Sequence, residues 1–280
     1  MIFKIMKNYC YINGKIITSD KLFVSGYDIG LLRGYAIYEG ITTHNNKPFY
    51  LSDHLKRFRK SALRLGLKIP LTVIQIKKVI QTLIKKNGFD RTNLRLILSG
   101  GKTIDGIEYD THKSTFFILA EKWNPLAKNL YEKGGKLITE NHLRFMPEVK
   151  TTHYITAVRL QSKRKKAKAI EILFVSNGKV LECSTSNIFM FNDDVLITPK
   201  NNVLLGITRE AVLDIAKKHF KIKQCDIPLS EFLKSDEVFI TSSYKDIVPI
   251  IKIDKEVIGD GQVGKNTLKI MGLFSELTNK

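Results

Sequence analysis

The chain has 280 residues, of which 43% are hydrophobic, enough for one or two globular domains with a substantial core. No apolar run reaches the ~18–20 residues that span a bilayer, and residues 1–11 lack the long apolar stretch of a secretion signal. We therefore expect a cytoplasmic protein. Its three cysteines and six histidines show no metal-ligand spacing, so we expect reduced thiols and no metal site.

The charge is strongly basic, since 46 basic and 27 acidic residues give a net charge of +19. Such a balance attracts anionic cofactors and substrates, and a nucleic-acid-binding protein is the hypothesis from another functional class. The densest basic cluster, residues 163–168, lacks the interleaved aromatic residues on which nucleic-acid bases stack. We interpret it as a solvated basic loop and expect neither a nucleic-acid nor a membrane partner.

The first half of the chain predicts two hairpins, two helices and two further strands. Asn13-Gly14 lies between short apolar runs, which is a strong hairpin signal, and Asn45-Asn46 marks a second hairpin within residues 38–50. A helix is expected from Ser52, as its N-cap, to Leu65, and another from residue 71 to 86 before Gly88. The expected strands are residues 93–99 and 115–120.

The segment 121–135 contains Pro125 and Gly134-Gly135, which favours a linker. Strands and helices then mix without strict alternation, which indicates an α+β fold. We therefore expect a small N-terminal domain at residues 1–121, a linker at 122–135 and a larger domain at 136–280. The helices expected after the linker are residues 154–163, 208–219 and a last one from 266; the strands are 136–139, 171–176, 179–183, 187–191, 195–198, 237–241 and 249–253.

Four segments carry candidate chemistry: residues 50–61, 146–154, 180–189 and 204–210. Glu182 stands in an apolar, strand-like context, where a carboxylate needs a partner or a function. Gly206 precedes a helix, and a helix start offers free N–H groups to a phosphate. Lys150, in contrast, is one lysine among many, and composition gives no reason to choose it. Each segment alone has an ordinary structural explanation.

Together and in this order, the four segments resemble the class IV aminotransferase family, the fold-type IV enzymes that use pyridoxal 5′-phosphate (PLP). The resemblance extends from residues 28–34 to 258–261. It implies a small N-terminal α/β domain, a larger C-terminal pseudo-barrel domain and an active site between them in a homodimer. It also implies PLP as the cofactor.

The resemblance implies a role for each candidate cofactor residue. Lys150 matches the lysine that bonds the PLP aldehyde and moves the proton during transamination. Glu182 matches the carboxylate that faces the pyridine nitrogen, and Arg57 matches the arginine that contacts the phosphate. Tyr154 matches a tyrosine at the phenolic oxygen. The remaining phosphate contacts are expected from Ile207, Thr208, Ser242 and Ser243.

The substrate residues depart from the better-known subfamilies. Branched-chain enzymes carry Tyr-x-Arg-Pro where this chain has Asn93-Leu94-Arg95-Leu96, and Arg33 replaces an aromatic or small residue. The pair resembles a D-amino-acid aminotransferase subgroup, in which the counterpart of Arg95 holds the substrate carboxylate. The counterpart of Arg33 reaches in from the neighbouring subunit. Tyr38 is the third expected substrate contact.

A guanidinium group is the preferred partner of a carboxylate, so two arginines suit a dicarboxylate. We therefore predict a D-amino-acid transaminase that acts on D-glutamate or D-alanine with 2-oxoglutarate or pyruvate. A branched-chain L-amino-acid aminotransferase is the second hypothesis, and aminodeoxychorismate lyase is the third, because the cofactor motifs are common to all three.

Overall fold

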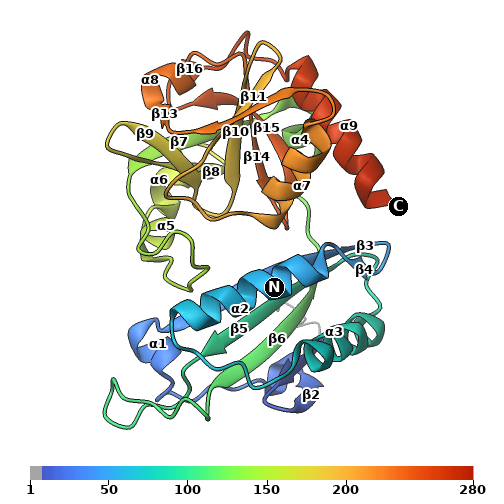
Figure 1. Ribbon diagram of the computed structural model, residues 1–280, viewed down its shortest axis with the longest axis vertical. Helices are drawn as coiled ribbons and strands as arrows, with labels where there is room; N and C mark the ends of the chain where they lie inside the picture. The colour runs from blue at the N-terminus through green and yellow to red at the C-terminus, as the bar shows by residue number, and fades with distance from the viewer. Residues whose placement is uncertain (1–7, 280) are drawn as a thin grey trace. The chain divides into compact units, whose positions relative to one another are not determined.

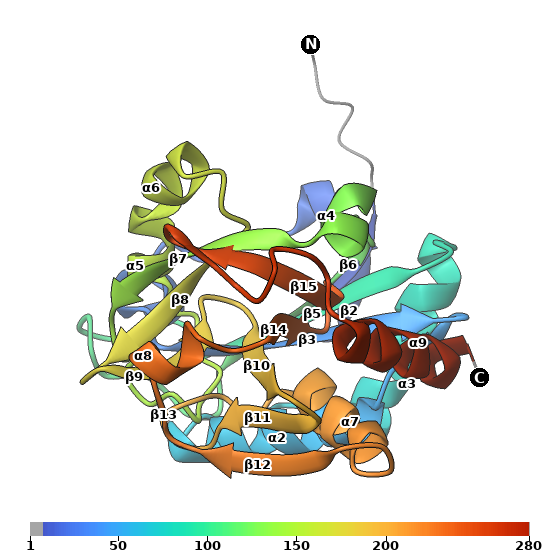
Figure 2. The same cartoon turned by 90° about the horizontal axis from the view of Figure 1, so that it is seen from above.

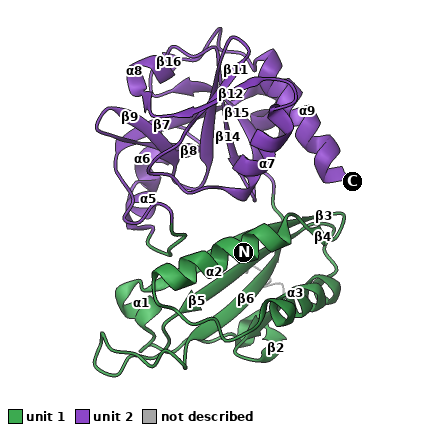
Figure 3. Ribbon diagram, in the orientation of Figure 1, with its two compact units in different colours: residues 1–124, 149–153 green, residues 125–148, 154–280 purple. Residues whose placement is uncertain are grey.

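The computed structural model describes residues 8–279, which divide into two compact units (Figure 3). Unit 1 comprises Met1–Asn124 with Val149–His153, and unit 2 comprises Pro125–Glu148 with Tyr154–Lys280. The expectation of a missing secretion signal rests on residues 1–11, most of which lie outside the described part. The expected domains, 1–121 and 136–280 around a linker, stay a prediction.

Unit 1 is built on a six-stranded antiparallel sheet in the order β2-β1-β6-β5-β3-β4 (Figure 1). Its strands are β1 (Tyr9–Ile12), β2 (Lys15–Thr18), β3 (Ala36–His44), β4 (Lys47–Pro48), β5 (Thr92–Ser99) and β6 (Thr115–Lys122). Its helices are α1 (Ile29–Arg33), α2 (Leu51–Arg64) and α3 (Val73–Asn87), with a 3₁₀ turn, η1, at Ser19–Lys21. Both predicted hairpins are confirmed.

The two faces of this sheet differ in burial. On β5, Leu94, Leu96 and Leu98 are fully buried, while Arg95 and Ile97 between them are half-buried. This period of two follows from the pleat, which sends successive side chains to opposite faces. Helices α2 and α3 pack against the sheet and supply buried side chains of their own. The face that carries Arg95 is the more open one.

The ends of the two long helices test the capping predictions. α3 begins after Thr72, whose hydroxyl accepts from the amide of Gln75 in a capping box, and it ends at Gly88 with φ +59°. α2 begins one residue before the predicted N-cap Ser52. Its N-cap is Tyr50, with φ +45° and no side-chain cap. The prediction of Ser52 as the cap was therefore wrong.

Residues 149–153 lie along β3 as a short extra strand. The amide of Tyr38 donates to the carbonyl of Lys150 at 2.9 Å, and the amide of Thr152 donates to the carbonyl of Ala36 at 3.0 Å. Ile37 and Thr151 form the bridge between these two bonds. The backbone of Lys150 is thereby fixed against the edge of the sheet.

Unit 2 is a ten-stranded mixed sheet with helices around it. The strand order is β12-β11-β10-β14-β15-β7-β8-β9-β13, with β16 paired to β15. The strands are β7 (Gly135–Asn141), β8 (Glu171–Ser176), β9 (Lys179–Cys183), β10 (Asn187–Asn192), β11 (Val195–Pro199), β12 (Lys221–Cys225), β13 (Ile227–Pro228), β14 (Glu237–Ser242), β15 (Asp246–Ile253) and β16 (Glu256–Val257). The helices are α4 (Lys128–Lys133), α5 (Ile155–Arg159), α6 (Gln161–Lys166), α7 (Ile207–Ala216), α8 (Leu229–Phe232) and α9 (Lys265–Asn279).

The large sheet curls on itself around an apolar core. Strand β9, near one end of the strand order, contacts β10 and β11 from the other part of the sheet (Figure 2). Fully buried residues such as Leu173, Met190, Phe232 and Ile240 fill the space inside. The mixed α+β class and the near-barrel form of the larger unit agree with the expectation.

Two local predictions need correction. The helix expected at residues 154–163 is broken at Leu160 into α5 and α6. The basic cluster at 163–168 was expected as a loop, yet most of it is helical in α6. This cluster contains no glycine, proline or asparagine and so carries no turn signal. Its backbone forms helical hydrogen bonds instead. The expected linker also contains the short helix α4. Among residues 8–279, no helix is long and apolar enough to cross a membrane.

Candidate active site

Lys150 and Tyr38 form a pair at the open edge of the unit 1 sheet. Backbone pairing holds the two residues side by side, and the Nζ of Lys150 lies 4.4 Å from the centroid of the Tyr38 ring. The amide of Lys150 also points at the Oγ of Ser61 on α2, at 3.4 Å. A flexible lysine side chain is thus carried on a backbone segment that is anchored on two sides.

Arg95 lies on the same sheet, close to this pair. In the β3–β5 register, Tyr38 faces Ile97 and Gly40 faces Arg95, so all four side-chain positions share one face. Because Gly40 has no side chain, the space beside Arg95 is not filled from β3. The guanidinium is 43% exposed and contacts Glu121 at 3.5 Å. Arg95 is therefore a cation on the open sheet face that also carries Tyr38.

Arg33 lies at the C-terminal end of α1, where the sequence expectation placed a substrate contact from a neighbouring subunit. Its side chain is exposed, and a Cβ built at Gly106 would lie 3.1 Å from its Nη2. The loop after β5 therefore runs beside α1. A bridge between Asp28 and Lys102 and a hydrogen bond from Thr103 to Tyr27 hold the two segments together.

Arg57 is held by a buried carboxylate that the sequence analysis did not assign. Glu39 is fully buried on β3 and accepts from the Nε of Arg57 at 2.9 Å and from its Nη2 at 2.6 Å. His54 approaches the same carboxylate with Nδ1 at 3.0 Å. Because an ionised carboxylate only accepts, Nδ1 carries the proton. This bidentate pairing fixes the orientation of the guanidinium plane.

The charges in this cluster follow from its burial and its cations. Burial alone would raise the pKa of Glu39, but the charges of Arg57 and His54 and their hydrogen bonds hold it well below its usual range. Burial lowers the pKa of His54, with a contribution from Arg57 and Lys150, against the opposite effect of Glu39. Glu39 is therefore ionised and His54 neutral at physiological pH, so Arg57 supplies the lasting positive charge.

Glu182 lies on β9 in unit 2 and has two strong partners. The Nε of Arg144 donates to its Oε1 at 2.8 Å, and the amide of Leu204 donates to its Oε2 at 3.0 Å. Arg144 also donates to the carbonyl of Pro147. The carboxylate is 8% exposed and the guanidinium 11%. Its buried, hydrogen-bonded state satisfies the requirement that the sequence raised for an acid in an apolar strand.

The start of α7 lies next to Glu182 through the loop that precedes it. Gly206 is the N-cap, with no side-chain cap for the amides that follow, and Ile207 and Thr208 open the helix. A Cβ at Gly206 would lie 2.0 Å from Oδ1 of Asn187, so only glycine fits. The Nδ2 of Asn187 donates to the carbonyl of Leu204 at 2.7 Å. This packing fixes a helix start whose dipole and N–H groups favour an anion.

Ser242 and Ser243 lie at the end of β14, at the same end of the unit 2 sheet. Asn187, which packs on Gly206, pairs with Thr241 one residue before Ser242. The Oγ of Ser242 is buried, and within the described residues it has no hydrogen-bond partner. A buried hydroxyl of this kind fits a site for a polar ligand. Tyr154, half-buried, is the N-cap of α5.

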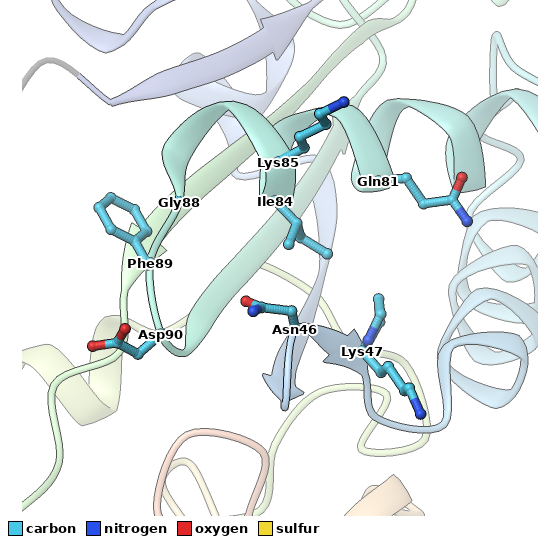
Figure 4. Close-up of a pocket in the computed structure, with 9 residues that line it drawn as sticks. Asn46, Lys47, Gln81, Ile84, Lys85, Gly88, Phe89 and Asp90 are labelled. Atoms are coloured by element: carbon cyan, nitrogen blue, oxygen red, sulfur yellow. The ribbon is translucent and has the colours of Figure 1, made fainter.

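Another region carries a pocket that is separate from these residues. A pocket of about 500 Å³ lies between the β3–β4 turn and the last turn of α3 (Figure 4). Its lining includes Lys47, Lys85 and Asp90, and no residue that the sequence assigned to the cofactor or substrate. The part of the chain that is described holds no group of three or more His, Cys, Asp or Glu side chains suited to a metal ion.

The structure groups the predicted residues within each unit. In unit 1, Lys150 lies beside Tyr38, and both Lys150 and Arg57 act electrostatically on His54. In unit 2, Glu182, the α7 start and the end of β14 meet at one end of the sheet. Several residues that orient these groups were not predicted from the sequence. They are Glu39, His54, Arg144, Asn187 and Arg209.

Some of these residues had a usable signal. Glu39 lies between apolar residues on a strand, as Glu182 does, and the argument applied to Glu182 would have found it. Arg209 is fully buried directly after Thr208, and its Nη2 donates to the carbonyl of Pro199 at 3.1 Å and to Gln224 at 2.9 Å. Arg144 had no signal, because it lies in an irregular loop among many basic residues.

Comparison with known proteins gives the family. The family model described as Amino-transferase class IV matches residues 36–253 of the chain. A provisionally named branched-chain-amino-acid aminotransferase of Methanocaldococcus jannaschii is 31% identical, covering 96% of each chain. The D-alanine aminotransferase of Listeria monocytogenes is 28% identical over 95% of this chain and 94% of its own.

A solved structure agrees with these relatives. The branched-chain amino acid aminotransferase of T.th., solved with pyridoxamine 5′-phosphate, superposes with a TM-score of 0.90 at 25% identity, covering 99% of this chain and 95% of the other. The family match spans well over half of the chain, and the fold agrees over nearly all of it. The chain therefore belongs to the class IV aminotransferases and is a transaminase that uses pyridoxal 5′-phosphate.

Proposed function

We propose that this transaminase exchanges an amino group between a D-amino acid, D-glutamate or D-alanine, and a 2-oxo acid, 2-oxoglutarate or pyruvate. The observation that supports this most is the position of Arg95. Its half-exposed guanidinium shares the open sheet face with Tyr38, diagonally across the Gly40 gap, and the Lys150 amine lies over the Tyr38 ring. Diagonal neighbours on a sheet are within reach of long side chains.

The residues present fit the cofactor. When bound, PLP supplies an aldehyde that takes up an amino group and a pyridine ring that accepts electrons from the substrate carbon. Lys150 is the proposed lysine that bonds this group and carries the proton to and from the substrate carbon. Glu182 is the proposed partner of the pyridine nitrogen, and Tyr154 of the phenolic oxygen.

Each unit, taken by itself, offers donors that suit the proposed phosphate contacts. Arg57 contributes a fixed positive charge, oriented by Glu39. The Ile207 and Thr208 amides at the α7 start contribute N–H groups, and Ser242 contributes a buried hydroxyl without another hydrogen bond in the described chain. Ser243 completes this set. Charge-assisted hydrogen bonds and a helix start are the usual donors to phosphate.

Arg95 and Arg33 are proposed to hold the substrate. Arg95 offers a planar fork that matches a carboxylate, and its contact with Glu121 is a half-exposed one that a substrate could replace at low cost. Arg33, from a neighbouring subunit, would then take the second carboxylate of D-glutamate. Tyr38 is the proposed aromatic contact beside the reacting carbon. The Listeria relative, named for D-alanine, supports this choice of enantiomer.

A homodimer is proposed because unit 1 has an apolar surface around Arg33. Exposed large side chains gather on the segment before and within α1 and on the loop beside it. They are Phe23, Tyr27, Leu31, Ile104 and Ile107, each more than two-thirds exposed. Exposed apolar side chains gathered on neighbouring segments are typical of a surface that meets a partner. A second copy is the expected partner, since Arg33 would then reach its neighbour's substrate. We also propose a cytoplasmic location, in keeping with three free thiols in the described chain.

A full-turnover assay with chiral analysis tests this proposal. Purified enzyme with D-glutamate and pyruvate should produce D-alanine, whereas L-glutamate and pyruvate should produce little alanine. The enantiomer is identified by chiral chromatography after derivatisation. Production of L-alanine from L-glutamate, with none from the D-substrate, would contradict the proposal.

The second candidate is a branched-chain L-amino-acid aminotransferase, which the Methanocaldococcus relative favours. It predicts turnover of L-leucine with 2-oxoglutarate in the same assay. The third candidate, aminodeoxychorismate lyase, predicts release of pyruvate from aminodeoxychorismate without any amino acceptor. The three activities can be separated because they differ in the products formed.

A further inference from the structure

Glu171 is a buried carboxylate that none of the roles above uses. It lies at the start of β8, is 2% exposed, and accepts hydrogen bonds from a whole turn of the chain. Ser184 donates to its Oε2 at 2.7 Å, and Ser186 donates to its Oε1 at 2.6 Å. Thr185 donates from its amide at 3.0 Å and from its hydroxyl at 2.6 Å. These three residues form the complete connection between β9 and β10.

This connection joins one proposed cofactor residue to a residue that packs against the start of α7. Glu182 is the second-last residue of β9, and Asn187, which packs on Gly206, is the first of β10. The turn is closed by the amide of Cys183, which donates to the carbonyl of Ser186 at 2.8 Å. With all its hydroxyl groups bound to one carboxylate, the turn has a single arrangement, and Glu182 and Asn187 are held at a fixed separation.

Lys245 brings a second turn to the same carboxylate. Its Nζ donates to Oε1 of Glu171 at 2.6 Å and to the hydroxyl of Thr185 at 2.6 Å. Lys245 lies in the turn between β14 and β15, and its amide approaches the carbonyl of Ser242 at 3.3 Å. Its side chain is only 19% exposed. The ion pair thus connects the turn after Glu182 with the turn that carries Ser242 and Ser243.

The charges explain why the lysine is needed. A buried carboxylate with only hydroxyl and amide partners keeps a net negative charge, whereas the Lys245 amine neutralises it. Removal of one member of a buried pair leaves the other uncompensated, which costs far more than the loss of a surface ion pair. The turn at 184–186 would then lose both its charge balance and its connection to the Ser242 turn.

We propose that Glu171 and Lys245 are positioning residues for the PLP site. They fix the turn after Glu182, on the pyridine-nitrogen side, relative to the turn after Ser242, on the phosphate side. The inference rests on the proposed roles of Glu182 and Ser242. Glu171 and Lys245 act through those residues and have no proposed contact with the cofactor. The pair sets the distance between these two turns, which are proposed to contact opposite ends of the rigid PLP molecule.

The test replaces Lys245, because its position near the surface makes a change there less disruptive than one at Glu171. In Lys245→Met, we expect faster amide hydrogen exchange in residues 184–187 and 242–246 of the PLP-loaded enzyme. We also expect a dissociation constant for PLP that is about tenfold higher, measured by titrating the apoenzyme with PLP. Lys245→Arg, which keeps the charge, should restore both properties in large part.

Lys255→Met is the matched control, since Lys255 is an exposed lysine in the next turn, between β15 and β16. It should leave exchange and PLP affinity at wild-type values. Wild-type exchange in both turns and wild-type affinity in Lys245→Met would overturn the inference. So would exchange that rises in one turn alone, because the pair would then not connect them.

Two further variants separate this inference from the site assignment on which it rests. Glu182→Gln and Ser242→Ala should each lower PLP affinity if the proposed cofactor residues are right. If both bind PLP as the wild type does, the site assignment fails. If they bind PLP weakly while Lys245→Met does not, the site stands and the positioning role of Glu171 and Lys245 is refuted.

Discussion

The amine of Lys150 lies 4.4 Å from the centroid of the Tyr38 ring, on a backbone segment hydrogen-bonded to the strand that carries Tyr38. Residues 149–153 group with unit 1, while the chain on both sides of them belongs to unit 2. The lysine is therefore positioned by the small unit's sheet. A lysine side chain on an anchored strand has a fixed backbone and a flexible end, which suits the role of bonding and releasing a cofactor that we propose for Lys150.

Replacement of Lys150 by alanine should abolish covalent attachment of PLP. Borohydride reduction of the wild-type holoenzyme, followed by peptide mass spectrometry, should find the cofactor mass on the peptide that contains Lys150. The variant should show no labelled peptide and no turnover. Lys60→Ala, which removes an exposed lysine of α2, is the control and should be labelled normally. A label elsewhere in the wild-type chain would refute the assignment of Lys150.

Glu39→Gln should weaken PLP binding through Arg57. The amide keeps the shape but loses the charge that orients the guanidinium, so we expect the PLP dissociation constant to rise about tenfold. Binding of pyridoxal, which lacks the phosphate, should change much less. Glu121→Gln, at a half-exposed carboxylate of the same sheet, should leave PLP binding unchanged. An equal loss for PLP and pyridoxal would show that Glu39 does not act through the phosphate.

Arg95→Ala should impair the amino acid and spare the cofactor. A charge-assisted bond to the substrate carboxylate would be lost, and we expect kcat/KM for D-glutamate to fall about 100-fold. Affinity for PLP should stay within a factor of about two, since Arg95 is not among the proposed phosphate contacts. The measurements are steady-state kinetics and PLP titration of the same protein. Loss of PLP with unchanged substrate kinetics would mean that Arg95 is misassigned.

Acid stability should report the Glu171 charge. Burial would raise its pKa, but Lys245 and the hydrogen bonds of the 184–186 turn lower it from 4.5 to about 2. Because the folded-state pKa is the lower one, its stabilising contribution is complete above about pH 5 and is lost as pH falls from about 4.5 towards 2. The full contribution is on the order of 3 kcal/mol.

The comparison for this prediction is Glu171→Gln. The difference in unfolding free energy between wild type and variant should be constant above pH 5 and shrink below pH 4.5. Circular dichroism is the suitable signal, because the single tryptophan, Trp123, lies in unit 1 while Glu171 lies in unit 2. A difference in unfolding free energy that does not change with pH would mean that folding does not lower the pKa of the Glu171 carboxyl.

Much of the fold was predictable because its signals are local. Asn13-Gly14 forms the expected turn with both residues at positive φ, +41° and +93°, and Gly88 ends α3 in the left-handed region. Strands β8 and β9 begin and end where the sequence placed them. The short elements α1 and β12 were missed, since five residues carry too little periodicity to stand out.

The site was less predictable because its connections are long-range. Glu182 was selected from an apolar strand pattern, and its partners Arg144 and Leu204 confirm that it is not an isolated acid. No local pattern could pair Glu171 with Lys245, which is 74 residues away. The family resemblance selected Lys150, and neither composition nor spacing would have done so. The roles of the site residues stay predictions.

The half-reaction with single amino acids tests the proposed function most directly. Enzyme in its PLP form is mixed separately with D-glutamate, D-alanine and L-leucine, without an acceptor, and conversion to the pyridoxamine form is followed by its absorbance. We predict fast conversion with both D-amino acids and little with L-leucine. Fast conversion with L-leucine and none with the D-amino acids would contradict the account, and it would make the chain a branched-chain enzyme in which Arg33 and Arg95 do not have the proposed roles.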